Sequence, residues 1–313
     1  MILSTLSLAN SRYNIYSEYY TQIDSIQKFF GDILSTNKDI FYNKIIAMPC
    51  DGIHSNFTEH FLSSYNIYRW HKLICVEYSN NRELCKLFGN IGTGRKHIFI
   101  DGKYHKTENL YGSGDFRTNE VKEIMLSSDY IITNPPFSLT QSLILTCLES
   151  YKTSFFIVGS HLLVANPKLL NFYISGKLHF YDYHNKKFYV PNIDSYKTIG
   201  TSCWISNVNI SKFHKKLSCR KYKDILSDTG IKQHYLSTYE ADISNGIPKF
   251  DGKNCICVDK IDMIPEDYHD EIAVPLTISL YDISDFEVIG ISDWDGTVCN
   301  KTVFRRLILR RRE

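Results

Sequence analysis

The segment DYIITNPPFSL, residues 129–139, decides how the fold of this chain is interpreted. Its apolar run, residues 130–133, has the length and composition of a short buried strand. Asn134 and two prolines follow, and the prolines end the strand because proline has no N–H to donate to a neighbouring strand. Apolar residues at helical spacing resume over residues 139–148. The segment therefore predicts a buried strand, a rigid turn and a helix.

The same alternation of strands and helices extends over about residues 15–160. Apolar runs at residues 44–48, 73–76 and 154–159 are typical of buried strands, and residues 120–127 have helical spacing. This order favours a mostly parallel sheet with crossover helices, which is an α/β fold. The turn at Asn134 then lies at the carboxyl edge of the sheet, where such folds bind ligands.

The composition is that of a globular protein, with 43% hydrophobic and 22% charged residues in a chain of 313. Nine scattered cysteines favour reduced thiols over a disulfide framework. The N-terminus has no basic leader, and no stretch approaches the ~20 apolar residues of a membrane span. We therefore expect a cytoplasmic protein without membrane contact. The eleven histidines lack the spacing of a metal motif, so we expect no metal site.

After about residue 204 the alternation of strands and helices gives way to sequence rich in tyrosine, lysine and aspartate. This change predicts two parts, residues 1–204 and residues 205–313. The formal net charge is only +2, but basic residues gather in two clusters of the second part. Each cluster is either a solvated face or a set of phosphate contacts. The clusters are Lys212, Lys215, Lys216, Arg220, Lys221 and Lys223, and Arg305, Arg306, Arg310, Arg311 and Arg312.

The turn after the strand offers fixed hydrogen-bond acceptors. The amide oxygen of Asn134 and the carbonyl of Pro135 are held by the rigid backbone of Pro135 and Pro136. Two such acceptors suit the protons of an exocyclic amine, and Phe137 offers a face for a planar base. The alternative is that Asn-Pro-Pro is simply a rigid turn.

Three further segments fall in the order that a cofactor site requires. MPCDGIHSNF, residues 48–57, leaves a predicted strand and opens a predicted helix, where backbone donors can hold a cofactor. GSGDFR, residues 112–117, has a carboxylate and a ring that suit a purine, although it could be a surface turn. EYYTQ, residues 18–22, could close over a cofactor, although paired tyrosines often only pack.

Together these segments resemble the EcoRI-type family of adenine-specific DNA methyltransferases. EYYTQ, CDGIHSNF and GSGDFR are similar to its cofactor motifs, and DYIITNPPFSL is similar to its catalytic motif. TSCWISN, residues 201–207, and AVPLTISLYDISDFEVIG, residues 273–290, also resemble segments of this family. The resemblance therefore extends along most of the chain.

The resemblance implies a Rossmann-like class I S-adenosylmethionine-dependent domain in residues 1–204 and a C-terminal target-recognition region in residues 205–313. The implied reaction transfers the methyl group of S-adenosylmethionine to adenine N6 in double-stranded DNA, with base flipping. A cognate restriction endonuclease is a further candidate partner. The implied catalytic residues are Asn134, Pro135, Pro136 and Phe137. The implied cofactor-binding residues are Tyr20, Thr21, Asp51, Ser55 and Asn56, with Asp115 and Phe116 at the adenine ring and Glu77 as candidate for the ribose.

Two other functions compete with this one. Asn-Pro-Pro-aromatic motifs also occur in methyltransferases that act on guanine N2 of RNA or on glutamine side chains of proteins. A catalytically silent DNA-binding module could also keep the fold. The methylated product separates the first alternative from DNA adenine methylation, and S-adenosylmethionine binding separates the second.

Overall fold

A computed structural model describes residues 19–79, 94–150, 153–190, 194–227, 256–258, 260–292, 297–298, 301–302 and 305–312. Contacts divide the chain into two compact units, and each unit is built from separate segments. The first unit comprises Met1–Ser160 and Tyr183–Val208, and the second comprises His161–Asp182 and Asn209–Glu313. The predicted functional division at residue 204 stays a prediction.

The first unit is built on a mixed sheet whose strands run in the order β5-β4-β3-β2-β6-β7-β11. Its centre is parallel, because β2 pairs in parallel with both β3 and β6, and β6 pairs in parallel with β7. These strands are β2 (Ile45–Met48), β3 (Lys72–Glu77), β6 (Tyr130–Thr133) and β7 (Ser154–Ser160). The flanking strands β4 (Arg95–Ile100), β5 (Lys103–Asn109) and β11 (Ser202–Ser206) are antiparallel to their neighbours. The predicted α/β class is thus confirmed, with more antiparallel strands than expected.

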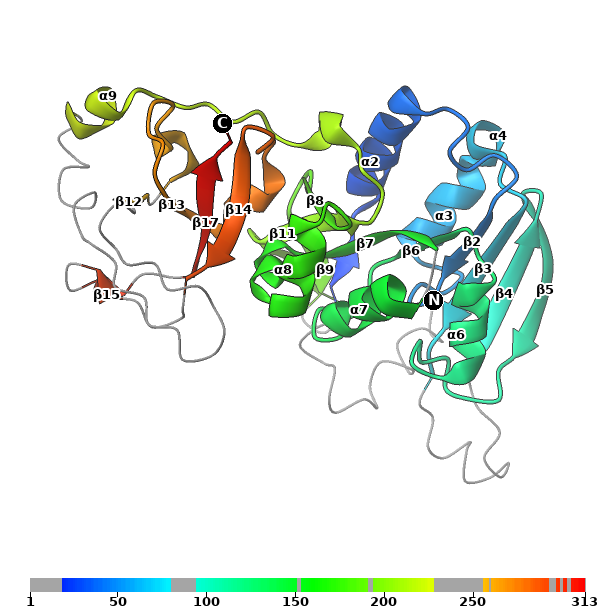
Figure 1. Cartoon of the computed structure of the whole chain (residues 1–313). Helices are drawn as coiled ribbons and strands as arrows, with labels where there is room; N and C mark the ends of the chain where they lie inside the picture. Colours follow the sequence, from blue (N-terminus) through cyan, green and yellow to red (C-terminus); the bar gives the residue numbers. More distant parts are fainter. Residues whose placement is uncertain are drawn as a thin grey trace. The chain divides into compact units, whose positions relative to one another are not determined.

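The helices of the first unit are α2 (Ile23–Thr36), α3 (Asn56–Ser63), α4 (Tyr65–Tyr68), α6 (Asn119–Leu126) and α7 (Thr140–Ser150). Helices α3, α6 and α7 correspond to the predicted ones, whereas α2, which precedes β2, and α4 were not predicted. Helices α2 and α3 lie beside each other (Figure 1). Phe29 of α2 stacks on Trp204 of β11 with ring centroids 4.2 Å apart, and Phe30 meets Phe61 of α3 edge-on at 5.1 Å. Aromatic packing therefore fixes these helices on the sheet.

A small antiparallel sheet completes the first unit. Its order is β1-β9-β10, with β1 at Tyr20–Thr21, β9 at Lys187–Val190 and β10 at Ser195–Thr198. Tyr20 and Tyr196 both lie directly across from Tyr189. Residues 20–21 are thereby held by a strand that lies more than 160 positions later in the sequence.

The second unit contains a four-stranded sheet in the order β12-β13-β17-β14. These strands are β12 (Ile256–Cys257), β13 (Ile272–Pro275), β14 (Phe286–Ile291) and β17 (Arg306–Arg311). Its other elements are η1 (His161–Ala165), α8 (Pro167–Ile174), β8 (His179–Asp182), η3 (Ser211–Phe213), α9 (Tyr222–Ser227), η4 (Ile261–Met263), η5 (Leu276–Leu280), β15 (Thr297–Val298) and β16 (Lys301–Thr302). Across the described part of the chain, no helix has both the length and the apolarity that crossing a bilayer requires.

Candidate active site

Three adjacent parallel strands end at one edge of the sheet in the first unit. Asp51 follows β2, Glu77 is the last residue of β3, and Asn134 follows β6. Because β2 lies between β3 and β6, the turns that carry Asp51 and Asn134 are neighbours. The structure thus brings together predicted residues from three separate segments at the edge where α/β folds bind ligands.

The side chain of Asp51 joins the turn after β2 to the turn after β6. Its Oδ2 accepts hydrogen bonds from the Thr133 hydroxyl at 2.6 Å and from the Asn134 backbone N–H at 3.0 Å. The Thr133 hydroxyl in turn accepts a hydrogen bond from the Cys50 N–H at 3.1 Å. Thr133 is fully buried and was not among the residues predicted from sequence. It is a positioning residue, because it fixes the relative place of Asp51 and Asn134.

Asp51 is a buried carboxylic acid with an altered pKa. Burial raises the pKa of Asp51 to about 6, although hydrogen bonds from Thr133, the Asn134 backbone and Ser55 act in the opposite direction. Removal from water disfavours the charged form, whereas hydrogen bonds to the carboxylate favour it. The group therefore changes charge close to neutral pH.

Replacing Thr133 by valine tests the bridge between the two turns. Thr133→Val keeps the shape of the side chain but leaves the partly buried Cys50 N–H without its acceptor and Asp51 without one donor. We expect a fall of about 1–3 kcal/mol in the free energy of unfolding, measured by urea denaturation. We also expect a lower rate of the methyl transfer that the resemblance implies, measured per folded molecule.

The matched control for this variant is Thr153→Val. Thr153 is also buried in the first unit, and its hydroxyl donates to the Met125 carbonyl away from the two turns. Thr153→Val should change stability without changing turnover per folded molecule, and Thr133→Ser should restore both. Full turnover in folded Thr133→Val would show that the bridge does not position the site.

The amide of Asn134 is held in one orientation. Its Nδ2 donates to the backbone carbonyl of Tyr19, whereas its Oδ1 is buried and has no hydrogen-bond partner among the described residues. A buried acceptor without a donor costs free energy, so such a group in a native site calls for an explanation. The contact with Tyr19 leaves the Oδ1 atom with an acceptor position that no donor from the described part of the chain fills.

Phe137 belongs to an aromatic cluster with Tyr19 and Phe188. Its ring centroid lies 5.3 Å from that of Tyr19 and 5.8 Å from that of Phe188, which approaches edge-on. The Tyr19 and Phe188 rings also meet, at 6.2 Å. This cluster fixes the side chain that follows the two prolines, and Phe137 itself keeps partial exposure.

The segment after β2 opens helix α3 as predicted. Ser55 caps the helix, since its hydroxyl accepts a hydrogen bond from the Thr58 N–H at 3.1 Å. Asn56, the first helical residue, donates from Nδ2 to the backbone carbonyl of Thr21 at 2.7 Å. The predicted N-terminal segment therefore meets the start of α3. Thr21 is buried, whereas Tyr20 is 38% exposed, and a cofactor contact of Tyr20 stays a prediction.

Glu77 lies between two glycines of the predicted cofactor segments. A Cβ atom on Gly52 would lie 3.4 Å from Glu77 Cγ, and one on Gly114 would lie 2.6 Å from the Glu77 carbonyl oxygen. Gly114 also has a φ of +80°, so only glycine fits there without strain. Glu77 Oε2 and His97 Nε2 are 3.4 Å apart, and His97 Nδ1 is 2.8 Å from Thr107 Oγ1. The Glu77 side chain therefore lies beside Gly52, and the Glu77 backbone lies beside Gly114.

Asp115 and Phe116 are placed less favourably for direct ligand contact. Arg117 donates to the Asp115 carboxylate from Nε at 2.9 Å and from Nη2 at 2.6 Å. Burial would raise the pKa of Asp115, but the hydrogen bonds and charge of Arg117 outweigh burial and lower it. Phe116 is only 3% exposed. Contact of these residues with an adenine ring therefore stays a prediction.

The two basic clusters of the second unit differ in the contacts and the exposure of their side chains. Among the C-terminal arginines, Arg305 donates to the Ala165 carbonyl, Arg310 pairs with Glu271, and the guanidinium of Arg311 lies 4.5 Å from the Phe286 ring centroid. These contacts support the fold of the unit. In the earlier cluster Lys215 pairs with Asp182 at 2.8 Å. The exposed members of that cluster are Lys212, Lys216, Arg220, Lys221 and Lys223.

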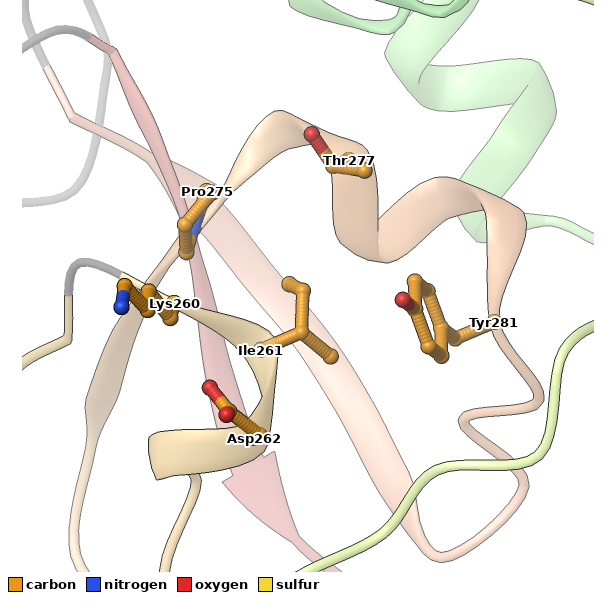
Figure 2. Close-up of a pocket in the computed structure, with 6 residues that line it drawn as sticks. All are labelled: Lys260, Ile261, Asp262, Pro275, Thr277 and Tyr281. Atoms are coloured by element: carbon orange, nitrogen blue, oxygen red, sulfur yellow. The ribbon is translucent and has the colours of Figure 1, made fainter.

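The second unit also has a hollow of about 440 Å³. Figure 2 shows Lys260 and Asp262 on one side and Thr277 and Tyr281 on another, with Ile261 between them. Its lining combines charged, hydroxyl and apolar side chains, and it contains none of the predicted catalytic or cofactor-binding residues.

Comparison with known proteins identifies the family of this chain. The family model described as "Adenine-specific methyltransferase EcoRI" matches residues 7–307, which is nearly the whole chain. The chain belongs to the EcoRI family of adenine-specific methyltransferases. The predicted family and the predicted function, adenine-specific DNA methylation, are thereby confirmed. No solved structure gives a significant match to this EcoRI-family chain.

Three curated relatives of this EcoRI-family chain are similar over most of their length. "Type II methyltransferase M.MgeORF184P" of Mycoplasma genitalium is 29% identical over 87% of this chain and 82% of its own. "Type II methyltransferase M.EcoRI" of Escherichia coli is 25% identical over 94% of this chain and 92% of its own. "Type II methyltransferase M.MpnI" of Mycoplasma pneumoniae is 26% identical over 87% of this chain and 82% of its own.

Proposed function

We propose that this EcoRI-family enzyme methylates N6 of an adenine that is flipped out of duplex DNA, with Asn134 as its central catalytic residue. The observation that carries the proposal is the buried, unpartnered Oδ1 of Asn134, whose orientation is fixed by the Tyr19 carbonyl. An adenine amino group is a donor of the kind that this acceptor lacks. A purine ring is also the size of group that Phe137 can stack on.

Asn134 and Pro135 act on the adenine amine through hydrogen bonds. The lone pair of N6 is delocalised into the ring, which makes the amine a poor nucleophile. Acceptors for both N6 protons, Asn134 Oδ1 and the Pro135 carbonyl, favour the pyramidal form that attacks. Because the two turns are fixed by Asp51 and Thr133, these acceptors need little reorganisation during the reaction.

S-adenosylmethionine, when bound, supplies an electrophilic methyl group on a sulfonium. The residues around the carboxyl edge of β2 and β3 suit it chemically. The ionised form of Asp51 would complement the positive charge next to Asn134, and Glu77 would accept hydrogen bonds from the ribose hydroxyls. We assign the methionine end to Thr21, Ser55 and Asn56 at the start of α3, with Tyr20 nearby, and the adenine ring to Asp115 and Phe116.

The same proposal assigns roles to the two predicted parts of the chain. The parallel strands β3, β2, β6 and β7 support a Rossmann-like class I domain within residues 1–204. The exposed basic residues Lys212, Lys216, Arg220, Lys221 and Lys223 support phosphate contacts in a target-recognition region within residues 205–313.

Methyl transfer from radiolabelled S-adenosylmethionine to duplex DNA tests the proposal. We expect the label in DNA, recovered as N6-methyladenine after digestion to nucleosides. Label found only in protein or RNA would reject DNA adenine as the acceptor. Binding of DNA without any binding of S-adenosylmethionine would instead identify a catalytically silent module.

Sequencing of genomic DNA from cells that express the protein would extend this test. Long-read sequencing reports modified adenines together with their sequence context. Modification at one short sequence would support site-specific methylation, and protection of that sequence from a matching endonuclease would support a restriction-linked partner. Modification without sequence preference would contradict target recognition by residues 205–313.

A further inference from the structure

The carboxylate of Asp51 is buried without a positively charged partner among the described residues. Asp51 is only 6% exposed, and its Oδ2 accepts from two neutral donors, the Thr133 hydroxyl and the Asn134 backbone N–H. No lysine, arginine or histidine of the described ranges forms an ion pair with it. Neutral donors offset only part of the free energy that a carboxylate loses on leaving water, so buried carboxylates are normally paired with a cation. The ionised form of Asp51 therefore needs a positive charge from elsewhere.

The ionisable groups packed around Asp51 include two thiols that stay neutral. Cys50 precedes it in the turn after β2, and Cys75 belongs to the neighbouring strand β3. Burial raises the pKa of Cys50, and the charge of Asp51 raises it further. Burial likewise raises the pKa of Cys75 to about 12. The turn after β6 and the start of α3 contribute the hydroxyls of Thr133 and Ser55, which are uncharged as well.

Two further carboxylates lie near Asp51, and each has a basic side chain beside it. A Cβ atom on the glycine after Asp51 would lie 3.4 Å from Cγ of Glu77, whose Oε2 is 3.4 Å from Nε2 of His97. Asp115 is close enough for its charge to raise the pKa of the thiol before Asp51, and it forms an ion pair with Arg117 at 2.6 Å. Because both basic groups lie beside other carboxylates, the cation that compensates Asp51 has to come with a ligand.

The methyl donor of the proposed reaction carries such a cation close to Asp51. S-adenosylmethionine has two positive charges, on its sulfonium and on the α-ammonium of its methionine end. Displacement at the methyl carbon requires the amine, that carbon and the sulfur to lie in line, so the sulfonium has to come close to the amine held by Asn134. Asp51 accepts from the backbone N–H of the same residue. The sulfonium is thus the ligand charge that the reaction itself requires beside this carboxylate.

We propose that the buried carboxylate of Asp51 makes this site select the sulfonium of the methyl donor over the neutral thioether that remains after methyl transfer. The inference rests on the proposed function. The sulfonium offsets the burial of the carboxylate, whereas the thioether brings no charge. The α-ammonium is present in donor and product alike, so it does not distinguish them. Loss of the sulfonium charge therefore weakens binding of the product and favours its exchange for a new donor molecule.

This selection couples binding of the donor to release of a proton. The pKa of Asp51, raised by burial, is about 6 in the protein alone. A cation beside a carboxylate lowers the pKa of that carboxylate, so the donor favours the ionised form and displaces the proton into the buffer. The protonated form has no charge to offer the sulfonium. Affinity for the donor therefore rises as the pH rises from about 5 to 7, whereas affinity for the thioether gains nothing over this range.

Calorimetric titration of the unmodified protein measures this proton. At pH 6, in buffers of different ionisation enthalpy, we expect S-adenosylmethionine to release about half a proton more than S-adenosylhomocysteine. We also expect the Kd for S-adenosylhomocysteine divided by that for S-adenosylmethionine to rise about tenfold between pH 5 and pH 7.5. Equal proton release by the two ligands, with a ratio that does not change with pH, would overturn the proposal.

Substitution of the carboxylate tests the same selection at one pH. At pH 7.5 we expect Asp51→Asn to raise the Kd for S-adenosylmethionine about tenfold more than the Kd for S-adenosylhomocysteine, and to remove the extra proton at pH 6. Glu77→Gln is the matched control, because the Glu77 side chain is 42% exposed, so water screens its charge. The ribose assigned to Glu77 is also common to both ligands. Glu77→Gln should therefore raise both Kd values by a similar factor.

Two further outcomes separate the proposal from the function on which it rests. An equal loss of affinity for both ligands in Asp51→Asn would overturn the selection and would place the carboxylate at a group that donor and product share, such as the α-ammonium. Failure of the unmodified protein to bind S-adenosylmethionine at any pH would instead reject the proposed function itself.

Discussion

Asn134→Ala is expected to lower the rate of methyl transfer by about 10²- to 10³-fold while affinity for S-adenosylmethionine stays nearly unchanged. The substitution removes the buried Oδ1 acceptor, which in the proposed reaction acts on the reacting amine rather than on the cofactor. It also removes the Nδ2 contact with the Tyr19 carbonyl. Single-turnover methyl transfer and calorimetric titration with S-adenosylmethionine measure the two quantities separately.

Asn207→Ala provides the matched control for Asn134→Ala. Asn207 is also a partly buried asparagine of the first unit, and its amide bonds the Phe155 N–H and the Thr153 carbonyl. Its loss should lower stability but leave turnover per folded molecule unchanged. Equal losses of cofactor binding and turnover in Asn134→Ala would contradict the role assigned to its oxygen.

Asp51→Asn is expected to raise the free energy of unfolding above pH 6 while it lowers the rate of methyl transfer. The pKa of Asp51 is about 6 in the folded chain and 3.8 as the ordinary value, so folding favours the protonated form. The contribution of protonated Asp51 to the free energy of unfolding is fully present below about pH 4. It falls as the pH rises from about 4 to 6, because in this range Asp51 is already ionised in the unfolded chain but still protonated in the folded chain. Above this window the buried charge costs on the order of 3 kcal/mol.

Urea unfolding at several pH values measures this effect. At pH 8 the neutral asparagine should make the variant more stable than the unmodified protein, and the difference should vanish near pH 4. Methyl transfer should nevertheless fall, because the charge beside Asn134 is lost. Asp129→Asn is the control, since Asp129 is a carboxylate of the same unit that accepts from the Ile45 N–H but lies exposed. A variant less stable than the unmodified protein at pH 8 would show that hydrogen bonding outweighs burial at this position.

The central strands could be predicted from sequence because parallel strands covered on both faces are continuous apolar runs. The predicted strands at residues 44–48, 73–76, 130–133 and 154–159 correspond closely to β2, β3, β6 and β7. The hairpin of β4 and β5 was not predicted. Strand β5, KYHKTEN, is exposed along most of its length, so it lacks the apolar periodicity that marks a strand.

Part of the candidate site could be predicted because its residues follow strands that were themselves predictable. Asp51, Glu77 and Asn134 each follow or end a recognisable strand, and a parallel sheet brings such positions to one edge. The contacts of Tyr19 and Phe188 with Phe137 join segments distant in sequence, and no local pattern indicates them. The contacts of the arginines in residues 305–312 could not be predicted either. A run of basic residues does not indicate which of their side chains donate to backbone carbonyls.

The discontinuous construction of the first unit has a consequence for protein synthesis. Phe188 and Trp204, which pack against Phe137 and Phe29, belong to Tyr183–Val208 and so follow the first segment of the other unit in the chain. A ribosome would release the turn at Asn134 before it releases Phe188, the ring from this segment that packs against that turn. The nascent chain therefore cannot complete the packing of Phe137 until residue 188 of 313 has emerged.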